Sequence, residues 1–307
     1  MRYYYKIYGL IIQSDLMIEG ALEIQPGEAA ANIQVTIEKT NLPDEVTGNT
    51  PQEKNEVNAY MCKANQAWFR WYGYGSFRIL NGNRIEYQLV FGADMRKISE
   101  LILCIALFFV LYQRKMIIMH GSAIIWKGRT ILLSGESGAG KSTLAESLLA
   151  DGAGFLADDM VAIDDAWMAM PAYPQQKLCQ DQITEFMRKN YSMVELAEDA
   201  GEVKIGVRML ERFCREPQRV DALVILQKDN QRNEPTITEI TGSEKVKYVV
   251  SNLFKQDFYM HVGLNPEMFL RCVKFADRIR VFSLSRPVQG MTVAGQKQVL
   301  EHVLKDI

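Results

Sequence analysis

Residues 130–143 read TILLSGESGAGKST, and this stretch decides the fold. Thr130–Leu133 is apolar and typical of a buried strand, and Lys141–Ala150 is predicted to be a helix. Between them the pattern GxxxxGK[ST] is matched in full. Its glycines let the backbone fold around a phosphate, and the helix N-terminus adds a positive dipole end. Because chance matches usually lack this strand–loop–helix setting, the stretch predicts a nucleotide triphosphate site rather than a structural glycine turn.

The pattern also predicts which groups hold ATP and Mg²⁺. Lys141 is expected against the β- and γ-phosphates, and the Ser142 hydroxyl on Mg²⁺. The full set expected to bind the nucleotide is Gly135, Glu136, Ser137, Gly138, Ala139, Gly140, Lys141, Ser142 and Thr143. A phosphate loop names a ligand and a fold element but no reaction. Transfer to a hydroxyl also needs a carboxylate placed to take its proton.

Residues 155–163, FLADDMVAI, supply candidate carboxylates. Asp158 and Asp159 stand between two apolar stretches, at what reads as the end or a break of a strand. Adjacent residues of an extended chain point to opposite sides, so one carboxylate can face the metal and the other an incoming hydroxyl. A solvated Asp-Asp turn explains the pair equally well, and Asp164-Asp165 shows how common such pairs are.

His120 lies in the predicted strand just before the phosphate-loop strand. A single histidine in a strand is more often a structural residue than a catalytic one. His261 and His302 are assigned no role.

Together these elements resemble the catalytic domain of the HPr serine kinase/phosphorylase family. The resemblance rests on His120-Gly121-Ser122-Ala123, then Gly135–Ser142, then Ala157–Val161, in that order. The interval from Lys141 to Asp158 also resembles the family's. The firm part covers residues 116–161, and residues 221–307 are similar only in their alternation of strands and helices.

The resemblance implies ATP-dependent transfer to a serine hydroxyl of a peptide or small protein. By position, Lys141 resembles the phosphate-binding lysine and Ser142 a magnesium ligand. Asp158 resembles the general base, Asp159 the second carboxylate of the metal site, and His120 the histidine that supports the aspartates. Which aspartate is the base and which binds metal stays open.

Three departures argue against a bifunctional sugar-transport regulator. Thr143 stands where the family usually has Glu. The segment Val203–Arg208 is only a poor copy of the Glu-Ile-Arg-Gly signature of the reverse reaction, and the first hundred residues do not resemble the family's regulatory domain. The chain is more similar to the stand-alone HPr-kinase-like proteins that phosphorylate ribosomally made peptides, as in lasso-peptide tailoring.

The rest of the chain predicts the architecture. Alternating apolar and polar residues at 3–13 and 31–38, and a hairpin over 68–90 turning at Asn81-Gly82-Asn83, predict a β-rich N-terminal domain over 1–95. Its dense aromatic group is Trp68, Phe69, Trp71, Tyr72, Tyr74 and Phe77, favoured as core over a stacking surface. A connecting apolar helix is expected over 96–115. Residues 116–307 then form an α/β phosphate-loop kinase domain of the HPr-kinase type, a mixed sheet with flanking helices.

Several local elements follow from shorter patterns. Residues 116–126 are expected to be one strand, followed by a turn at Lys127-Gly128. Residues 222–226 read as a buried strand, and Thr241–Glu244 as a capping box before a helix. Residues 296–304 close the chain as another helix. Residues 41–58 and 181–201 are candidate loops over an acceptor, although 182–196 is favoured as a surface helix.

Net charge and composition limit which partners and locations are expected. The net charge of −2 and pI of about 6.0 disfavour nucleic-acid binding. The longest apolar run, Leu101–Tyr112, is shorter than the roughly 20 residues of a membrane span, so no membrane role is expected. Five scattered cysteines without metal-ligand spacing favour free thiols in the cytoplasm. The oligomeric state is left open, a homo-oligomer included, and a small-molecule kinase and a nucleotide-sensing ATPase remain as alternatives.

Overall fold

The computed structural model describes residues 1–29, 32–47, 58–196, 203–256, 258–259, 263–288, 290 and 292–305. The chain divides into two compact units, Met1–Met116 with Val194–Gly206, and Ile117–Met193 with Val207–Ile307. The helical segment expected as a connector thus lies in unit 1, which also takes a second piece of chain. As a result β15 (Ser192–Glu195) and β16 (Lys204–Arg208) each contain a point where the chain passes between units.

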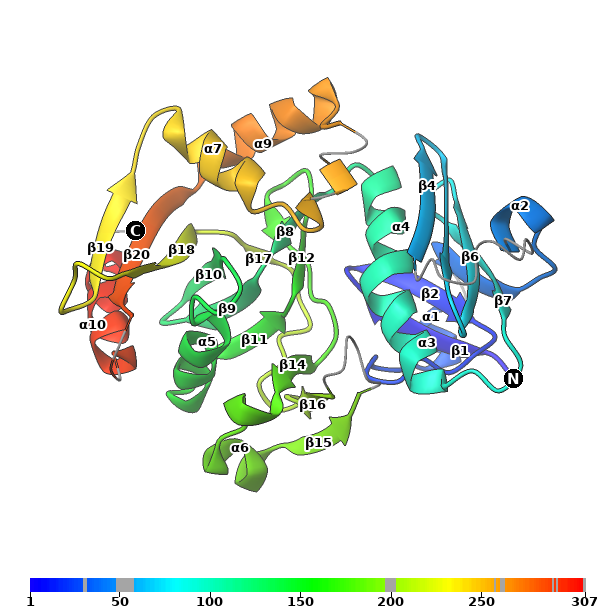
Figure 1. The fold of residues 1–307 in the computed structure, drawn as a ribbon, viewed down its shortest axis with the longest axis horizontal. Helices are drawn as coiled ribbons and strands as arrows, with labels where there is room; N and C mark the ends of the chain where they lie inside the picture. Colours follow the sequence, from blue (N-terminus) through cyan, green and yellow to red (C-terminus); the bar gives the residue numbers. More distant parts are fainter. Residues whose placement is uncertain are drawn as a thin grey trace. The chain divides into compact units, whose positions relative to one another are not determined.

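Unit 1 is built on one twisted sheet with strand order β1-β2-β3-β7-β6-β5-β4, coloured blue to cyan in Figure 1. Its strands are β1 (Tyr3–Ile7), β2 (Leu10–Ser14), β3 (Val35–Lys39), β4 (Asn58–Lys63), β5 (Gln66–Trp71), β6 (Gly75–Leu80) and β7 (Arg84–Leu89). The short helices α1 (Pro26–Ala29) and α2 (Asp44–Thr47) pack beside it. Residues 48–57 of the expected loop at 41–58 lie outside the described residues.

Tight turns set the hairpins of this sheet. The turn expected at Asn81–Asn83 is present between β6 and β7, where Asn81 and Gly82 have φ of 52° and 63°. The alternating run over 3–13 forms a hairpin, β1 and β2, within the expected β-rich region. Tyr8 and Gly9 both take positive φ, so the chain reverses between β1 and β2. Because a tyrosine rarely adopts that conformation, the sequence carries little signal for this turn.

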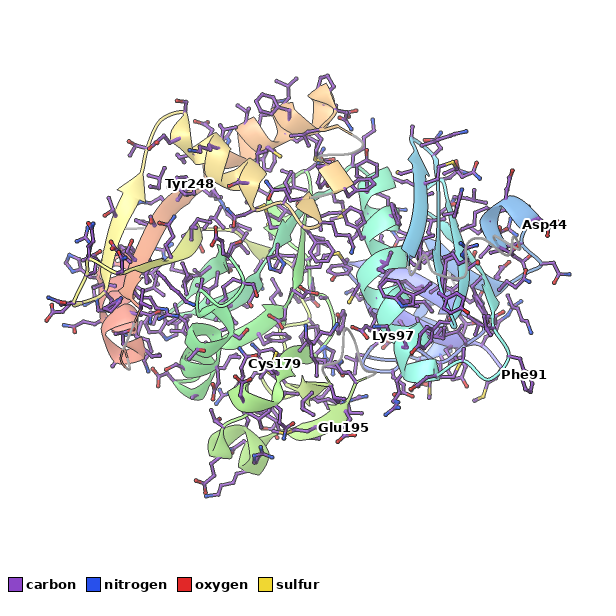
Figure 2. All side chains as sticks on the ribbon, viewed as in Figure 1. Asp44, Phe91, Lys97, Cys179, Glu195 and Tyr248 are labelled. Carbon is purple, nitrogen blue, oxygen red and sulfur yellow. The ribbon has the colours of Figure 1, made fainter. Side chains whose placement is uncertain are left out.

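A continuous helical segment covers part of the sheet. It consists of α3 (Met95–Leu101), a π-helical turn at Ile102–Ala106 and α4 (Leu107–Gln113). The Phe109 ring stacks on Phe69 at 6.3 Å, and Phe69 stacks on Phe77 at 4.7 Å. The aromatic group is therefore partly core, as expected, whereas its member Tyr72 is exposed. Phe91, labelled in Figure 2, is also exposed. No helix in the described ranges is long and apolar enough to span a membrane.

Unit 2 holds an α/β sheet with strand order β11-β9-β10-β18-β20-β19 (Figure 1). Its strands are β9 (Ser122–Trp126), β10 (Arg129–Gly135), β11 (Gly154–Ala157), β18 (Ala222–Asp229), β19 (Thr236–Ile240) and β20 (Arg280–Pro287). β10, β18 and β20 run parallel, and the outer pairings are antiparallel. The expected mixed sheet is therefore observed, and the expected strand at 222–226 is the buried part of β18.

Helices flank this sheet. α5 (Lys141–Ala150) packs on β9, β10 and α10 (Val293–Leu304). α7 (Glu244–Ser251) packs on α9 (Pro266–Arg278), which contacts β20. The capping box expected at Thr241–Glu244 is wrong, because Ser243 begins the helix in a helical conformation and makes no side-chain cap.

A second sheet of unit 2 has the order β17-β13-β12-β8. It contains β8 (Ile117–His120), β12 (Met160–Ile163), β13 (Met168–Ala169) and β17 (Gln218–Arg219). The single strand expected over 116–126 is wrong, because Gly121 divides it between the two sheets. Gly121 has φ of 153°, and a Cβ there would lie 2.2 Å from the Leu133 carbonyl oxygen. Only glycine allows the chain to turn from β8 into β9 so close to β10.

The remaining segment of unit 2 includes β14 (Gln175–Cys179), a 3₁₀ turn at Gln180–Gln182 and α6 (Glu185–Asn190). The surface helix favoured over 182–196 is therefore wrong in extent: α6 covers six residues, and β15 follows. Residues 197–201 of the candidate loop lie outside the described residues.

Candidate active site

The phosphate loop connects β10 to α5 as the sequence predicts. β10 ends at Gly135, whose φ is 130° and whose added Cβ would lie 2.4 Å from the Leu226 carbonyl oxygen. Gly138 and Gly140 also take positive φ, and α5 starts directly after Gly140, at Lys141. Each of these three glycines therefore has a conformational reason to be glycine. The glycine loop therefore leads directly into the N-terminus of α5, the position in a helix where anions bind.

Lys141 folds back over the loop. Its Nζ donates hydrogen bonds to the carbonyl oxygens of Gly135 at 2.7 Å and Glu136 at 3.0 Å. Burial lowers the pKa of Lys141, and the charges of Asp158 and Asp159 oppose that shift. The lysine and the two aspartates, which lie far apart in the sequence, thus share one electrostatic environment.

Strand register explains how these groups meet. β9 and β11 run so that Ser122 pairs with Leu133 of β10, and Ala157 pairs with Ala123. The end of β11, the start of β9 and the end of β10 therefore lie at one edge of the sheet. Met160 of β12 pairs with His120 of β8, which brings the histidine to the same place. Asp158 and Asp159 fill the step between β11 and β12.

Asp158 is the buried carboxylate of the pair. Its residue is 9% exposed, the Ser122 hydroxyl donates to its Oδ1 at 2.6 Å, and the Lys177 backbone N–H donates to its Oδ2 at 3.1 Å. Burial raises the pKa of Asp158 to about 6, helped by the charge of Asp159 and opposed by the Ser122 hydrogen bond. A carboxylate with a pKa near neutrality is suited to accepting and releasing a proton.

Asp159 faces a different environment. Its side chain is 34% exposed, and its φ of 66° is an uncommon value for a residue other than glycine. Its carbonyl oxygen accepts from the Gly121 N–H at 3.2 Å, which holds this backbone in place. Asp158 is therefore buried and Asp159 partly exposed. The expected extended conformation is not present at Asp159, because its φ is positive. Backbone strain held at a site of this kind is a common feature of functional residues.

His120 lies next to Asp159. Its Nδ1 is 3.5 Å from Asp159 Oδ1, and its backbone N–H donates to the Asn252 carbonyl oxygen at 2.8 Å. Partial burial lowers the pKa of His120, the Asp159 charge raises it and the Lys141 charge lowers it. The histidine is thus held by the Asn252 carbonyl through its backbone, and its side chain contacts Asp159.

The predicted magnesium ligands fit that ion in part. Ser142, in the first turn of α5, and Asp159 offer a hydroxyl and a carboxylate oxygen, both of which suit Mg²⁺. No group of three or more His, Cys, Asp or Glu side chains in the described ranges has metal-site geometry. Such a donor set suits Mg²⁺ that keeps its waters and is carried by nucleotide phosphates, the usual arrangement at phosphoryl-transfer sites.

Sequence reasoning assigned no role to four side chains or backbone groups that contact the site. Ser122 belongs to the quoted His-Gly-Ser-Ala segment, so its position beside His120 was the available signal. Lys177 contributes only a backbone N–H to Asp158, which no side-chain pattern reveals. Lys228 and Arg286 flank the glycines of the phosphate loop from strands far along the chain.

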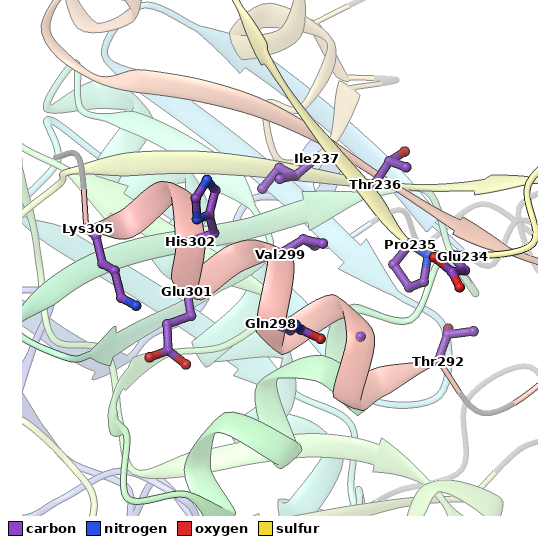
Figure 3. A pocket seen from close by; sticks show the side chains of 11 residues that line it. Glu234, Pro235, Thr236, Ile237, Thr292, Gln298, Val299, Glu301, His302 and Lys305 are labelled. Atoms are coloured by element: carbon purple, nitrogen blue, oxygen red, sulfur yellow. The ribbon is translucent and has the colours of Figure 1, made fainter.

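A groove between β19 and α10 contains none of the predicted site residues (Figure 3). Its lining includes Pro235 and Ile237 from one side and Thr292, Val299 and His302 from the other. His302, to which the sequence gives no role, lines this groove.

Comparison with known proteins supports the resemblance over part of the chain. No family model matches it. Over 110 residues the chain is 33% identical to an HPr kinase/phosphorylase of Pelodictyon phaeoclathratiforme, a match that covers 34% of this chain and 32% of that protein. The chain therefore matches about a third of the length of this curated relative.

Among solved structures, the Hpr(Ser) kinase/phosphatase from Coxiella burnetii matches 62% of this chain and 97% of its own, with 13% identity and a TM-score of 0.31. A score this low carries no argument about the fold. The support for the HPr kinase/phosphorylase resemblance thus comes from the local sequence identity.

Proposed function

We propose that this protein is an ATP-dependent phosphotransferase of the HPr-kinase-like type that transfers the γ-phosphoryl group to a hydroxyl. The observation that carries the proposal is Asp158, a buried carboxylate with a pKa near 6 that shares its electrostatic environment with the phosphate-loop lysine. A nucleotide-binding loop by itself needs no such proton acceptor. Transfer to a hydroxyl does.

Each group of the site has a defined task in this reaction. The loop N–H groups and Lys141 hold and neutralise the phosphates. Ser142 and Asp159 would hold Mg²⁺, which would supply charge neutralisation on the transferred group. Asp158 takes the proton of the attacking hydroxyl, while the Ser122 hydroxyl and the Lys177 N–H fix its carboxylate. His120 orients Asp159.

The acceptor in this proposal is a serine hydroxyl of a peptide or small protein, with a ribosomally made, lasso-type peptide as one candidate. Its support is the resemblance to HPr serine kinases, together with the departures at Thr143 and Val203–Arg208 from the enzymes that also catalyse the reverse reaction. A small-molecule kinase would use the same core. A nucleotide-sensing ATPase would use the same loop and metal ligands, with Asp158 acting on a water molecule instead of on an acceptor hydroxyl.

Incubation of the full chain with γ-labelled ATP, Mg²⁺ and peptides encoded beside its gene tests the acceptor. Mass spectrometry then locates the added phosphate. A phosphoserine on one peptide supports the peptide-kinase assignment. Label on a small metabolite of a host extract would replace it by the small-molecule kinase. Sustained ATP hydrolysis without any labelled product, in both mixtures, would favour the ATPase.

A further inference from the structure

Two cations lie beside the phosphate loop on the flank away from the aspartates. Lys228 of β18 and Arg286 of β20 are direct partners in the parallel register of these strands. Gly135 pairs with Leu226 on β18, so Lys228 comes two residues after the point where the phosphate loop leaves the sheet. Both side chains therefore project at the edge where the loop lies.

Arg286 contacts the backbone carbonyl groups of the phosphate loop. Its Nε donates to the Ala139 carbonyl oxygen at 2.7 Å, and its Nη2 lies 3.4 Å from the Gly138 carbonyl oxygen. A Cβ on Gly140 would lie 3.1 Å from Arg286 Nε, so the guanidinium packs directly on the loop backbone. Its Nη1 donates to the carbonyl oxygen of Pro287 at 3.0 Å, which ties the side chain to its own strand. A planar guanidinium can fix two carbonyl groups at once.

Lys228 is exposed and lies over the loop at Gly138. A Cβ on Gly138 would lie 3.5 Å from Lys228 Nζ. Within the described part of the chain, neither Lys228 nor Arg286 has a carboxylate partner, whereas Arg78, Lys297 and Arg280 each pair with one. An unpaired ammonium beside a phosphate loop is a ready contact for an anion.

The sheet order gives the site two opposite sides. β9 and β11, which position the aspartates, lie on one side of β10, and β18 and β20, which carry the cations, lie on the other. The cations on β18 and β20 attract phosphate groups. The aspartates beside β9 and β11 suit a hydroxyl whose proton must be removed.

We propose that Lys228 contacts the phosphate chain of the nucleotide and that Arg286 is a positioning residue. Arg286 holds the Gly138 and Ala139 carbonyl groups outward, so that the loop N–H groups point at the phosphates. The nucleotide then extends over β18 and β20, and the acceptor enters from the β9–β11 side. This inference rests on the proposed function, since it assigns further residues to the same nucleotide site.

Isothermal titration with ATP, ADP and inorganic tripolyphosphate, each with Mg²⁺, tests the assignment. Lys228→Ala should weaken all three by about tenfold, the usual loss for one charge-assisted contact. The expected kinetic signature is a raised KM for ATP with an unchanged KM for the acceptor. Lys274→Ala, which removes an exposed lysine of α9, is the matched control and should bind as the wild type.

The test of Arg286 compares two variants. Arg286→Ala should weaken nucleotide binding and lower kcat, and Arg286→Lys should restore neither, because an ammonium cannot reproduce the planar two-carbonyl contact. Wild-type binding by Arg286→Lys would overturn the positioning role, and wild-type affinity in Lys228→Ala would overturn the phosphate contact. Thermal unfolding of each variant separates loss of fold from loss of binding.

Lys141→Ala separates this inference from the proposed function. If it loses ATP binding while Lys228→Ala and Arg286→Ala bind normally, the nucleotide site stands and the inference fails. If Lys141→Ala also binds ATP normally, the phosphate loop is not the nucleotide site, and the proposed function fails with it.

Discussion

At the residue scale, Asp158 is held between two opposing influences. Burial favours its neutral form, and the Ser122 and Lys177 hydrogen bonds favour its charged form. Burial is the larger influence, so the pKa rises to about 6 instead of falling as it would at a salt-bridged aspartate. The carboxylate is therefore mostly ionised at neutral pH yet basic enough to take a proton. That balance depends on the Ser122 hydroxyl.

Ser122→Ala is expected to move the acid limb of the activity–pH profile to higher pH. Removing the hydroxyl takes away a hydrogen bond that lowers the pKa of Asp158, so a larger fraction of the carboxylate is protonated at pH 6. Measurement of kcat/KM between pH 5 and 8 checks the shift. Ser192→Ala, at an exposed residue of β15, should leave the profile unchanged. A shift to lower pH in Ser122→Ala would contradict this balance.

The same pKa makes Asp158 costly to the fold at high pH. Its pKa in the folded chain lies above the ordinary value of 3.8. Protonated Asp158 therefore contributes fully to the free energy of unfolding below pH 4, and this contribution is lost as the pH rises through about 6. Asp158→Asn should stabilise the protein at pH 8 by about 2–3 kcal/mol and give little gain at pH 4. Urea unfolding at both pH values measures this, and a loss of stability at pH 8 would contradict it.

At the scale of elements, the site depends on where strands break. β8 and β9 belong to different sheets and are joined by Gly121, and β11 and β12 are joined across Asp158-Asp159. The two breaks lie together, because the Gly121 N–H donates to the Asp159 carbonyl oxygen. Both sheets are needed to hold His120 and the aspartates at one edge.

Gly121→Ala should destabilise unit 2 by about 3 kcal/mol, because it combines a strained φ with a backbone clash at the Leu133 carbonyl. Gly128→Ala is the matched control. It also has positive φ, but an added Cβ meets nothing within 4 Å, so the substitution should cost only about 1 kcal/mol. Thermal or urea unfolding compares the two. Equal losses of unfolding free energy in the two variants would show that the clash with Leu133 of β10 adds nothing to the cost of Gly121→Ala.

At the scale of the whole molecule, the sequence was most informative where chemistry restricts residue choice. The glycine loop between β10 and α5, the helix α5, the Asn81-Gly82 turn and the buried strand β18 are all predicted by the sequence, since glycine positions and apolar runs identify them directly. The breaks at Tyr8-Gly9 and Gly121 were missed, because an apolar run does not show where it changes sheets. Lys228 and Arg286 could not be found, since only the parallel pairing of β18 with β20 brings them to the loop.

The two units also differ in which of them carries the candidate catalytic residues. Unit 2 carries every residue of the candidate site, whereas unit 1 is a sheet and helix with an aromatic core. Its second piece of chain, Val194–Gly206, could not be assigned from the sequence, because no composition shift marks the passage. The phosphotransfer proposal therefore rests on the site in unit 2, and the acceptor proposal rests on the resemblance to HPr serine kinases.

The most direct test of the central claim compares Asp158→Asn with the wild type in ATP binding and in phosphoryl transfer. Asparagine keeps the shape of the side chain but cannot take a proton, so the variant should bind ATP within about twofold of the wild type and lose at least about a hundredfold in transfer, the usual contribution of a positioned base. Titration calorimetry gives the affinity, and labelled phosphate on the acceptor gives the rate. A variant that binds ATP and transfers phosphate at the wild-type rate would contradict the account.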